Sequence, residues 1–187
     1  KKGVITPATL NKHITGNTKL VSIMLANNEI GTIEPIKELA EIAHKHGTLF
    51  HTDAVQAVGH IPVNVRFLGI DMLSASAHKF NGPKGIGFLY IRKGTDIHSF
   101  IDGGAQEFGM RAGTENVAAI VAMAEALRKN CAYMDETESK LRKMENNFIQ
   151  ALIGAGIDFI PNGADNHLPG IINISIKNAS GEMLLHR

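Results

Sequence analysis

A succession of short apolar runs with one helical pattern between them constrains the fold of this chain more than any other feature. The run LVSIMLA at residues 20–26 has the length of a strand and the continuous apolar character of a strand buried on both faces. A helical pattern begins at Pro35 and ends at Gly47, and a second strand-length run follows at residues 48–52. A strand, a helix and another strand in this order predict a βαβ unit within a mostly parallel sheet.

Other patterns extend this arrangement along the chain. Apolar residues at close to 3.5-residue spacing from about Val117 to the glycines at 154 and 156 predict one long helix. A helix start at Ser180 reaches only as far as Arg187, which favours a piece of a longer protein. The remaining expected elements are a helix from Pro7 to about Ile14 with Thr6 as its N-cap, and strands at 72–76, 87–91, 157–160 and 170–176.

The composition excludes several classes of function. At 187 residues, with 44% hydrophobic and 20% charged residues, the chain has enough apolar material for a globular core. Its formal net charge of +1 gives no electrostatic signature of a nucleic acid partner or an anionic membrane. No apolar run approaches the ~20 residues that span a bilayer, and the first residues lack the apolar core of a signal peptide. We therefore expect a cytoplasmic protein that binds neither nucleic acid nor membrane.

Cysteine and histidine usage argues against disulfides and metals. Cys131 is the single cysteine, and its apolar position in the long helical pattern favours a buried, small hydrophobic role. The nine histidines show none of the spacings of zinc ligands, so no metal site is expected. His44 is expected to cap and solvate a helix end, and His60, which falls in a connection, is interpreted as a surface residue.

A lysine at the end of an expected strand is the first candidate for catalysis. In α/β sheets, ligands bind beyond the carboxyl ends of the strands, and Lys79 directly follows Ser-Ala-Ser-Ala-His. A lysine desolvated there has a lowered pKa, because burial disfavours the ammonium form, and its neutral amine can form a Schiff base with an aldehyde. If that aldehyde belongs to pyridoxal phosphate, a carboxylate must keep the pyridine nitrogen protonated. Asp53, at the end of the preceding expected strand, is predicted to be this buried carboxylate, which needs a cationic partner.

Further polar groups follow the neighbouring strands. Ser76 and His78 flank the approach to Lys79, and both can donate to phosphate oxygens. Gln56 lies three residues beyond the candidate carboxylate, and Asn28 follows the first expected strand.

Each of these residues also has an ordinary structural interpretation. Asp53 could cap a helix that begins at Ala54, because aspartate is a common N-cap. Asn27 and Asn28 could be turn residues, and Ser76 could be small for packing alone. For any one residue the structural interpretation is favoured. Three strand ends that together carry a lysine, an acid and amides favour a cofactor site.

Several blocks of the sequence resemble one enzyme family throughout the chain. They resemble consecutive blocks of the NifS/IscS-like cysteine desulfurases, which belong to the class-V branch of the fold-type I pyridoxal-phosphate enzymes. The blocks are VSIMLANNEIGTIEPI, FHTDAVQAVGHIPV, DMLSASAHKFNGPKGIGFLYIR, GGAQEFGMRAGTENV and LPGIINIS followed by GEMLL.

This resemblance implies a role for each candidate residue. Lys79 would form the Schiff base and, with His78, is a candidate catalytic residue. The resemblance implies that Asp53 pairs with the pyridine nitrogen, that Gln56 donates to the ring hydroxyl, and that Asn28 contacts the cofactor on the substrate side. It implies that Ser76 and His78 bind the phosphate. Thr114 would contact the phosphate of a neighbouring subunit, which implies a homodimer.

The resemblance also implies a domain organisation. Residues 1–116 would form part of the large pyridoxal-phosphate-binding α/β domain, with its mostly parallel sheet. Residues 117–153 would form a connecting helix region, and residues 154–187 would begin a small, truncated α/β domain. In the family, the first part of the cofactor site and the sulfur-accepting cysteine lie outside the matched blocks, so the isolated chain is expected to be inactive.

The implied reaction is the removal of sulfur from L-cysteine, which gives L-alanine and an enzyme persulfide. The sulfur would pass to an acceptor protein such as an iron–sulfur scaffold, or into a thiolation pathway. A selenocysteine lyase and another class-V aminotransferase are alternatives within the enzyme class. A non-catalytic structural fragment is the alternative outside it.

Overall fold

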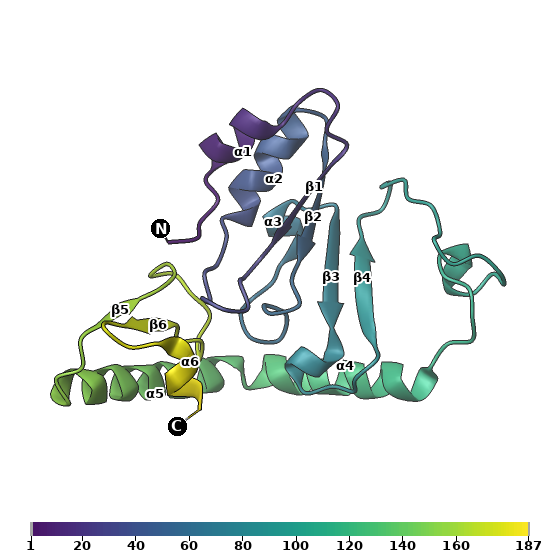
Figure 1. Ribbon diagram of the computed structural model, residues 1–187. Coiled ribbons are helices and arrows are strands. Elements are labelled where there is room, and N and C mark those ends of the chain that lie inside the picture. Colours follow the sequence, from purple (N-terminus) through teal and green to yellow (C-terminus); the bar gives the residue numbers. More distant parts are fainter. Residues whose placement is uncertain (1, 187) are drawn as a thin grey trace.

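The computed structural model describes residues 2–186, and a four-stranded sheet forms its centre (Figure 1). The strands are β1 (Leu20–Met24), β2 (Leu49–Asp53), β3 (Met72–Ser76) and β4 (Gly87–Ile91), in that spatial order. The first three are parallel, and β4 returns antiparallel beside β3. The mixed α/β fold with a mostly parallel sheet is therefore as the sequence predicts.

The early helices cover one face of this sheet. They are α1 (Pro7–His13), α2 (Ile36–Lys45) and α3 (Val65–Leu68). Parallel crossovers are almost always right-handed, so strands that follow one another in a single direction place their connecting helices on the same face. The buried side chains agree, because Phe50 and Leu73 on the sheet form one core with Leu39 of α2.

The other face of the sheet is much more open. Leu20 is 49% exposed and Leu89 is 50% exposed, whereas Phe50 on the covered face is fully buried. Ser22 of β1 is also exposed. The prediction that the run at 20–26 is buried on both faces is therefore wrong, because within this chain β1 is an edge strand with helices on one side only.

Helix boundaries follow the local signals closely. The Thr6 hydroxyl accepts a hydrogen bond from the Thr9 N–H of α1 at 3.1 Å, as expected of an N-cap. After α2 the backbone of Gly47 has φ +68°, a conformation that glycine adopts without steric penalty. The predicted start of α1 after Thr6 and the predicted end of α2 before Gly47 are both confirmed.

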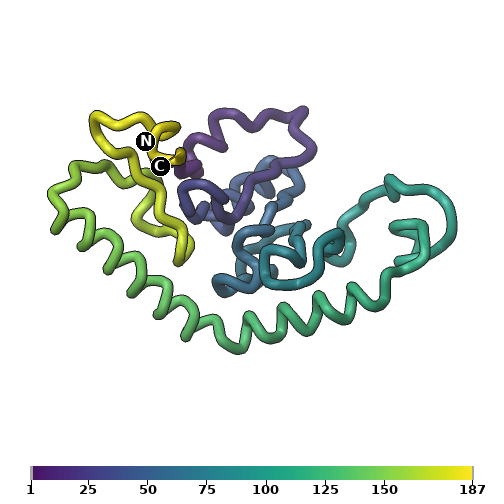
Figure 2. Tube along the Cα trace, turned by 60° about the horizontal axis from the view of Figure 1, so that its bottom comes forward, coloured from purple at the N-terminus to yellow at the C-terminus, as the bar shows by residue number. Residues whose placement is uncertain are grey.

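The expected long helix is in fact two helices that join at Tyr133. They are α4 (Val117–Ala132) and α5 (Met134–Gly154), and Tyr133 between them has φ −109° and ψ 16°. Hydrogen bonding continues across the joint, since the Tyr133 N–H still donates to the Lys129 carbonyl. The apolar spacing predicted the combined length of α4 and α5. It does not show that the backbone is distorted at Tyr133. Figure 2 shows the pair running as one bowed segment beside the rest of the chain.

A small C-terminal unit docks on α5 and on the loop after β1. It contains β5 (Phe159–Pro161), β6 (Ile174–Ile176) and α6 (Gly181–Leu185), with the two strands antiparallel. The Leu168 N–H donates to the Gly31 carbonyl at 2.8 Å, and the Gly170 N–H donates to the buried Glu145 carboxylate at 2.8 Å. The domain division at residues 116 and 153 stays a prediction.

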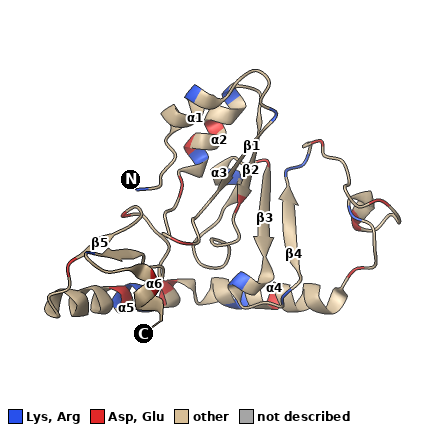
Figure 3. Ribbon diagram, viewed as in Figure 1, with Lys and Arg blue, Asp and Glu red and all other residues tan. Residues whose placement is uncertain are grey.

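Charged residues lie mainly outside the sheet. Both signs are mixed over α2 and α5, and the strands are almost free of charge (Figure 3). Asp53 is the one Asp, Glu, Lys or Arg within the residues of β1 to β4. Within residues 2–186, no helix combines the length and the apolar character that a membrane crossing requires.

A buried carboxylate ties together the end of the sheet opposite to Asp53. Asp71, only 5% exposed, accepts hydrogen bonds from the Phe50 N–H and from His44 Nε2, each at 2.8 Å, and lies 3.4 Å from Arg92 Nη1. His44 therefore contacts Asp71 and does not simply solvate a helix end. This cluster joins α2, β2 and the residue that follows β4.

Replacing Asp71 should destabilise the fold. In Asp71→Ala the Phe50 N–H is left buried without an acceptor and Arg92 loses its partner, so we expect the free energy of unfolding to fall by about 2–4 kcal/mol. Urea denaturation measures this change. The control is Asp96→Ala in an exposed loop, for which a change within about 0.5 kcal/mol is expected. Equal effects of the two variants would show that the Asp71 contacts do not stabilise the chain.

Candidate active site

Polar residues gather at the carboxyl edge of the three parallel strands. The register pairs Met24 with Asp53 and Asp53 with Ser74, so β1, β2 and β3 end at one edge of the sheet. Asn28, Gln56 and Lys79 each lie three or four residues beyond such a strand end. The helix α4 runs past this edge of the sheet (Figure 1). The predicted convergence of these strand ends is therefore present in the structure.

The turn that carries Lys79 combines buried anchors with exposed reactive groups. A single 3₁₀ turn, η1 (Ala77–Phe80), follows β3 directly. Ala77 and Phe80 are fully buried, while His78 and Lys79 between them are exposed. The expectation of a desolvated lysine is wrong for this chain, because side chains at the second and third positions of the turn point away from the core that its ends enter.

Ser76 and His78 meet just before the lysine. The Ser76 hydroxyl and His78 Nδ1 lie 2.8 Å apart, which is hydrogen-bond distance. A hydroxyl and an imidazole held together in this way can both turn donors toward an anion. The structure therefore places the two predicted phosphate contacts side by side.

The glycines after Lys79 let the chain turn back against its own strand. Asn81 has a left-handed backbone with φ 64°, and a Cβ on Gly82 would stand 2.8 Å from the Ala77 Cβ. A Cβ on Gly87 would stand only 2.3 Å from the Ala75 carbonyl oxygen. No side chain fits at this last position, so the sequence NGPKGIG folds β4 tightly against β3 and fixes where η1 begins.

Asp53 lies on the more open face of the sheet, at the end of β2. Its Oδ1 accepts a hydrogen bond from the Val55 N–H at 2.9 Å, and a turn, not a helix, follows from Ala54. The side chain is half-buried, and among residues 2–186 it forms no ion pair with Lys or Arg. The predicted burial of Asp53 is therefore only partial, and the alternative of a helix cap is wrong. The expected cationic partner, a pyridine nitrogen, stays a prediction. One carboxylate oxygen stays available to a ligand.

His51 shares this face with Asp53 two residues along β2. His51 Nδ1 lies 2.8 Å from the Ser22 hydroxyl on the neighbouring strand. Burial lowers the pKa of His51, and the negative charge of Asp53 opposes part of this effect. The two side chains are therefore close enough to influence each other electrostatically.

The two asparagines after β1 have different roles. Asn27 Oδ1 accepts hydrogen bonds from the Glu29 N–H at 2.8 Å and the Ile30 N–H at 3.0 Å, so the structural interpretation as a turn residue holds for Asn27. Asn28 is exposed beside it, and Gln56 is half-buried after β2. Neither amide is used in the turns that hold these loops.

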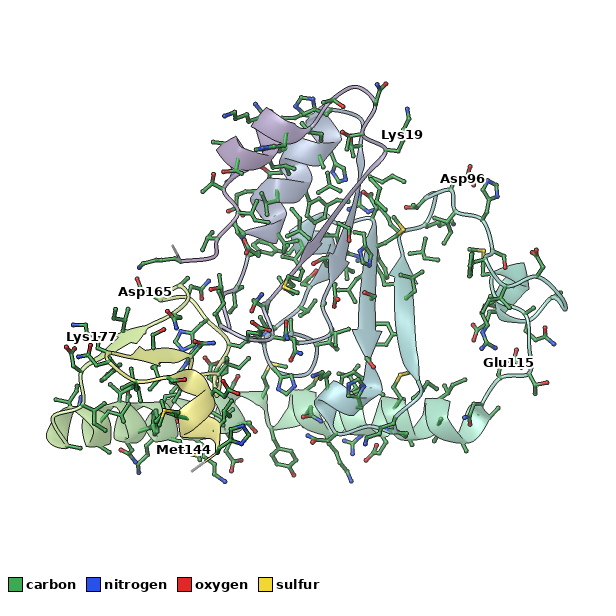
Figure 4. All side chains as sticks on the ribbon, in the orientation of Figure 1. Lys19, Asp96, Glu115, Met144, Asp165 and Lys177 are labelled. Carbon is green, nitrogen blue, oxygen red and sulfur yellow. The ribbon has the colours of Figure 1, made fainter. Side chains whose placement is uncertain are left out.

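Thr114 is not brought to the strand edge within this chain. It is exposed on the long connection between β4 and α4, which contains a short 3₁₀ turn, η2 (Glu107–Gly109). Figures 1 and 2 both show this connection extending away from the sheet, and Figure 4 labels the adjacent Glu115 at its far side. A contact of Thr114 with a second copy of the chain stays a prediction.

Cys131 is exposed, which contradicts its predicted burial. It lines an apolar cavity of about 480 Å³, together with Leu73 and Tyr90. These two residues point to the helix-covered face of the sheet, opposite to Asp53. The prediction failed because apolar spacing along one helix does not show whether another element covers it.

One contact of Lys79 was not expected from the sequence. His60 Nε2 lies 2.7 Å from the Lys79 carbonyl oxygen, and His60 is half-buried, not a free surface residue. The glycine that precedes it in VGHIP was the available signal, because Gly59 allows the close approach of this turn to Phe80.

The arrangement can hold a cofactor that needs an amine, an acid and anion donors. Three adjacent strand ends are followed by an exposed amine and a hydroxyl–imidazole pair. They also carry a carboxylate oxygen and two side-chain amides that have no partner among residues 2–186. Within residues 2–186 no three His, Cys, Asp or Glu side chains form a group that could hold a metal ion.

Comparison with known families gives one consistent result. The model of the family described as aminotransferase class-V matches residues 1–186. A protein named cysteine desulfurase IscS from Dictyoglomus turgidum is 52% identical over 99% of this chain and 47% of its own length. A protein of the same name from Methanosarcina thermophila is 45% identical over 99% of this chain and 46% of its own length. The chain therefore spans about half the length of these relatives.

Solved structures share the fold. A protein described as NifS-like superposes with a TM-score of 0.91 at 40% identity, over 99% of this chain and 51% of its own. DndA from Streptomyces lividans has a TM-score of 0.85 at 32% identity, over 99% of this chain and 53% of its own. SspA, solved in complex with cysteine, has a TM-score of 0.81 at 32% identity, over 100% of this chain and 52% of its own.

The titration of His51 tests whether Asp53 is placed as described. An NMR titration should give His51 a midpoint below the ordinary value of about 6.5, because burial disfavours the charged imidazole. In Asp53→Asn the midpoint should fall further, because the carboxylate that favours the charged form is gone. A midpoint that stays the same or rises in the variant would place Asp53 away from His51.

Proposed function

We propose that this chain, which belongs to the aminotransferase class-V family, carries the reactive lysine of a pyridoxal-phosphate-dependent cysteine desulfurase. One observation carries the proposal. Lys79, whose amine is exposed, comes just after the end of β3, at the same edge of the sheet as the Asp53 carboxylate at the end of β2. The chain that carries this pair is 52% identical to a protein named cysteine desulfurase IscS.

The residues at the strand edge fit pyridoxal phosphate. The cofactor has an aldehyde, a basic ring nitrogen, a ring hydroxyl and a phosphate, and each needs a different partner. Lys79 offers the amine, Asp53 the acid, and Ser76 with His78 the anion donors. Bound there, the cofactor would supply a carbonyl that links to amines and a protonated ring that withdraws electrons from the substrate α-carbon.

Lys79 and Asp53 would carry the central chemistry. Lys79 would hold the cofactor covalently through Nζ and, once displaced by the substrate amine, would move protons at the substrate carbon. Asp53 would keep a proton on the pyridine nitrogen through the oxygen that the Val55 N–H leaves free. An ionised carboxylate is required for this role.

The other predicted residues would orient the cofactor. Gln56 would donate to the ring hydroxyl, and Asn28 would contact the cofactor on the substrate side. Ser76 and His78 would hold the phosphate of the same subunit. We propose that Thr114 contributes to the phosphate site of a second copy, so that the active protein is a homodimer.

The substrate and the sulfur acceptor complete the proposal. L-cysteine is the proposed substrate, and the structural relative SspA was solved in complex with cysteine. Cys131 lines a cavity on the helix-covered face of the sheet, so we assign the sulfur-accepting thiol to a cysteine outside this chain. From that persulfide the sulfur would pass to an acceptor such as an iron–sulfur scaffold. The expected cytoplasmic location stays a prediction.

Three alternatives make different predictions. A selenocysteine lyase would act on selenocysteine in strong preference to cysteine, and an aminotransferase would convert an oxo acid into an amino acid without releasing sulfur. A non-catalytic fragment would fold without any selective reaction at Lys79. Two relatives that are 52% and 45% identical to this chain are named cysteine desulfurase IscS, which favours the desulfurase.

Trapping the cofactor on the chain tests the lysine directly. We expect that incubation with pyridoxal phosphate, reduction with borohydride and peptide mass spectrometry will find the label predominantly on Lys79. The label should disappear from this peptide in Lys79→Ala and persist in Lys84→Ala, which removes an exposed lysine of the next turn. Labelling spread equally over surface lysines would contradict the assignment.

Sulfide release tests the placement of the sulfur-accepting thiol. With L-cysteine and pyridoxal phosphate, the isolated chain should release no more sulfide than its Lys79→Ala variant, because Cys131 lies away from the strand edge. Lys79-dependent sulfide release that is lost in Cys131→Ser would show instead that Cys131 is the acceptor. Lys79-dependent release by the isolated chain would also exclude the non-catalytic alternative.

A further inference from the structure

The carbonyl groups of the Lys79 turn are held by two side chains from elsewhere in the chain. A helical turn leaves its last carbonyls without partners inside the helix. In η1, the Ala77 carbonyl accepts a hydrogen bond from the Gly82 N–H at 2.8 Å. Two further carbonyls of this turn, those of Lys79 and Phe80, have side-chain partners. His60 Nε2 lies 2.7 Å from the first, and Asn130 Nδ2 donates to the second at 2.7 Å.

This contact is built by close packing of three segments. A Cβ on Gly59, whose φ is +81°, would stand 2.8 Å from the Phe80 Cβ and 3.4 Å from the Asn130 Cβ. Only glycine lets the turn at 54–61 approach η1 and α4 so closely. His60 follows immediately and reaches past Phe80 to the carbonyl of Lys79.

The chemistry of His60 fixes its role in this contact. A carbonyl oxygen carries no hydrogen, so Nε2 must be the protonated ring nitrogen. The hydrogen bond therefore requires only this Nε2 proton, and a substituted side chain that also donates can replace it. Because Nε2 is occupied with the main chain of Lys79, the contact restrains the backbone and leaves the lysine amine free.

We propose that His60 and Asn130, which we call the carbonyl clamp, position the Lys79 backbone for reaction, with His60 as a further positioning residue. The clamp rests on the function proposed for Lys79. It links the Lys79 turn to the segment after Asp53, because the turn that carries His60 begins directly after Asp53. That turn is also bonded to β3, since the Ala54 N–H donates to the Ser74 carbonyl at 2.9 Å.

Hydrogen exchange tests the clamp without any cofactor. In His60→Phe, which keeps an aromatic ring but has no donor, we expect the amides of Asn81 and Gly82 to exchange about fivefold faster, the effect of losing one hydrogen bond. In His60→Gln, whose amide can donate to the same carbonyl, exchange should return close to the original rate. His98→Phe, a matched change in an exposed loop, should leave both amides unaffected. Unchanged exchange in His60→Phe, or no recovery in His60→Gln, would overturn the clamp.

Labelling with pyridoxal phosphate separates this proposal from the proposed function. The ratio of trapped label at Lys79 to label at Lys84 should fall several-fold in His60→Phe and recover in His60→Gln. An unchanged ratio beside a selectively labelled original chain would overturn the positioning role alone. No selective labelling of Lys79 in the original chain would contradict the proposed function, and hydrogen exchange would still decide whether the clamp holds the turn.

Discussion

The one-directional order of β1, β2 and β3 is the constraint on which the rest of this structure depends. Because parallel crossovers are right-handed, strands laid down in a single direction receive all their helices on one face. The same order brings three strand ends to one edge, where the chain must leave the sheet through loops. The covered face then supplies the core, and the edge supplies Asn28, Asp53, Gln56 and Lys79. Stability and chemistry are thus assigned to different parts of the same sheet.

The Lys79 turn shows how a flexible, exposed amine is held in place. Burial of a phenylalanine side chain such as Phe80 contributes about 1.5–3 kcal/mol, whereas a single hydrogen bond contributes about 1 kcal/mol. The buried ends of η1 therefore keep the turn attached to the core. The weaker but directional bonds of the carbonyl clamp can only set its orientation. Glycines at 59, 82 and 87 allow the approach that both effects require.

Much of this arrangement could be predicted from the sequence, because the signals that define it are local. The apolar runs, the cap at Thr6, the glycine at 47 and the polar residues after each strand depend on near neighbours in the chain. The errors concern contacts with distant parts. Leu20 and Cys131 were expected to be buried, but nothing in an apolar pattern shows whether another element covers it. Lys79 was expected to be desolvated, and its exposure depends on how a single 3₁₀ turn ends the strand. His60 was missed because its partner lies 19 positions further along the chain.

The central claim is that the carboxyl edge of β1, β2 and β3 binds pyridoxal phosphate. A backbone NMR titration of the chain with this cofactor tests the claim most directly, because it reports on every part of the chain at once. The account predicts that the largest chemical-shift changes fall on the segments after the three strands, around Asn28, Asp53 to Gln56 and Ser76 to Lys79. Changes centred on the apolar cavity beside Cys131, or spread evenly over surface lysines, would contradict it.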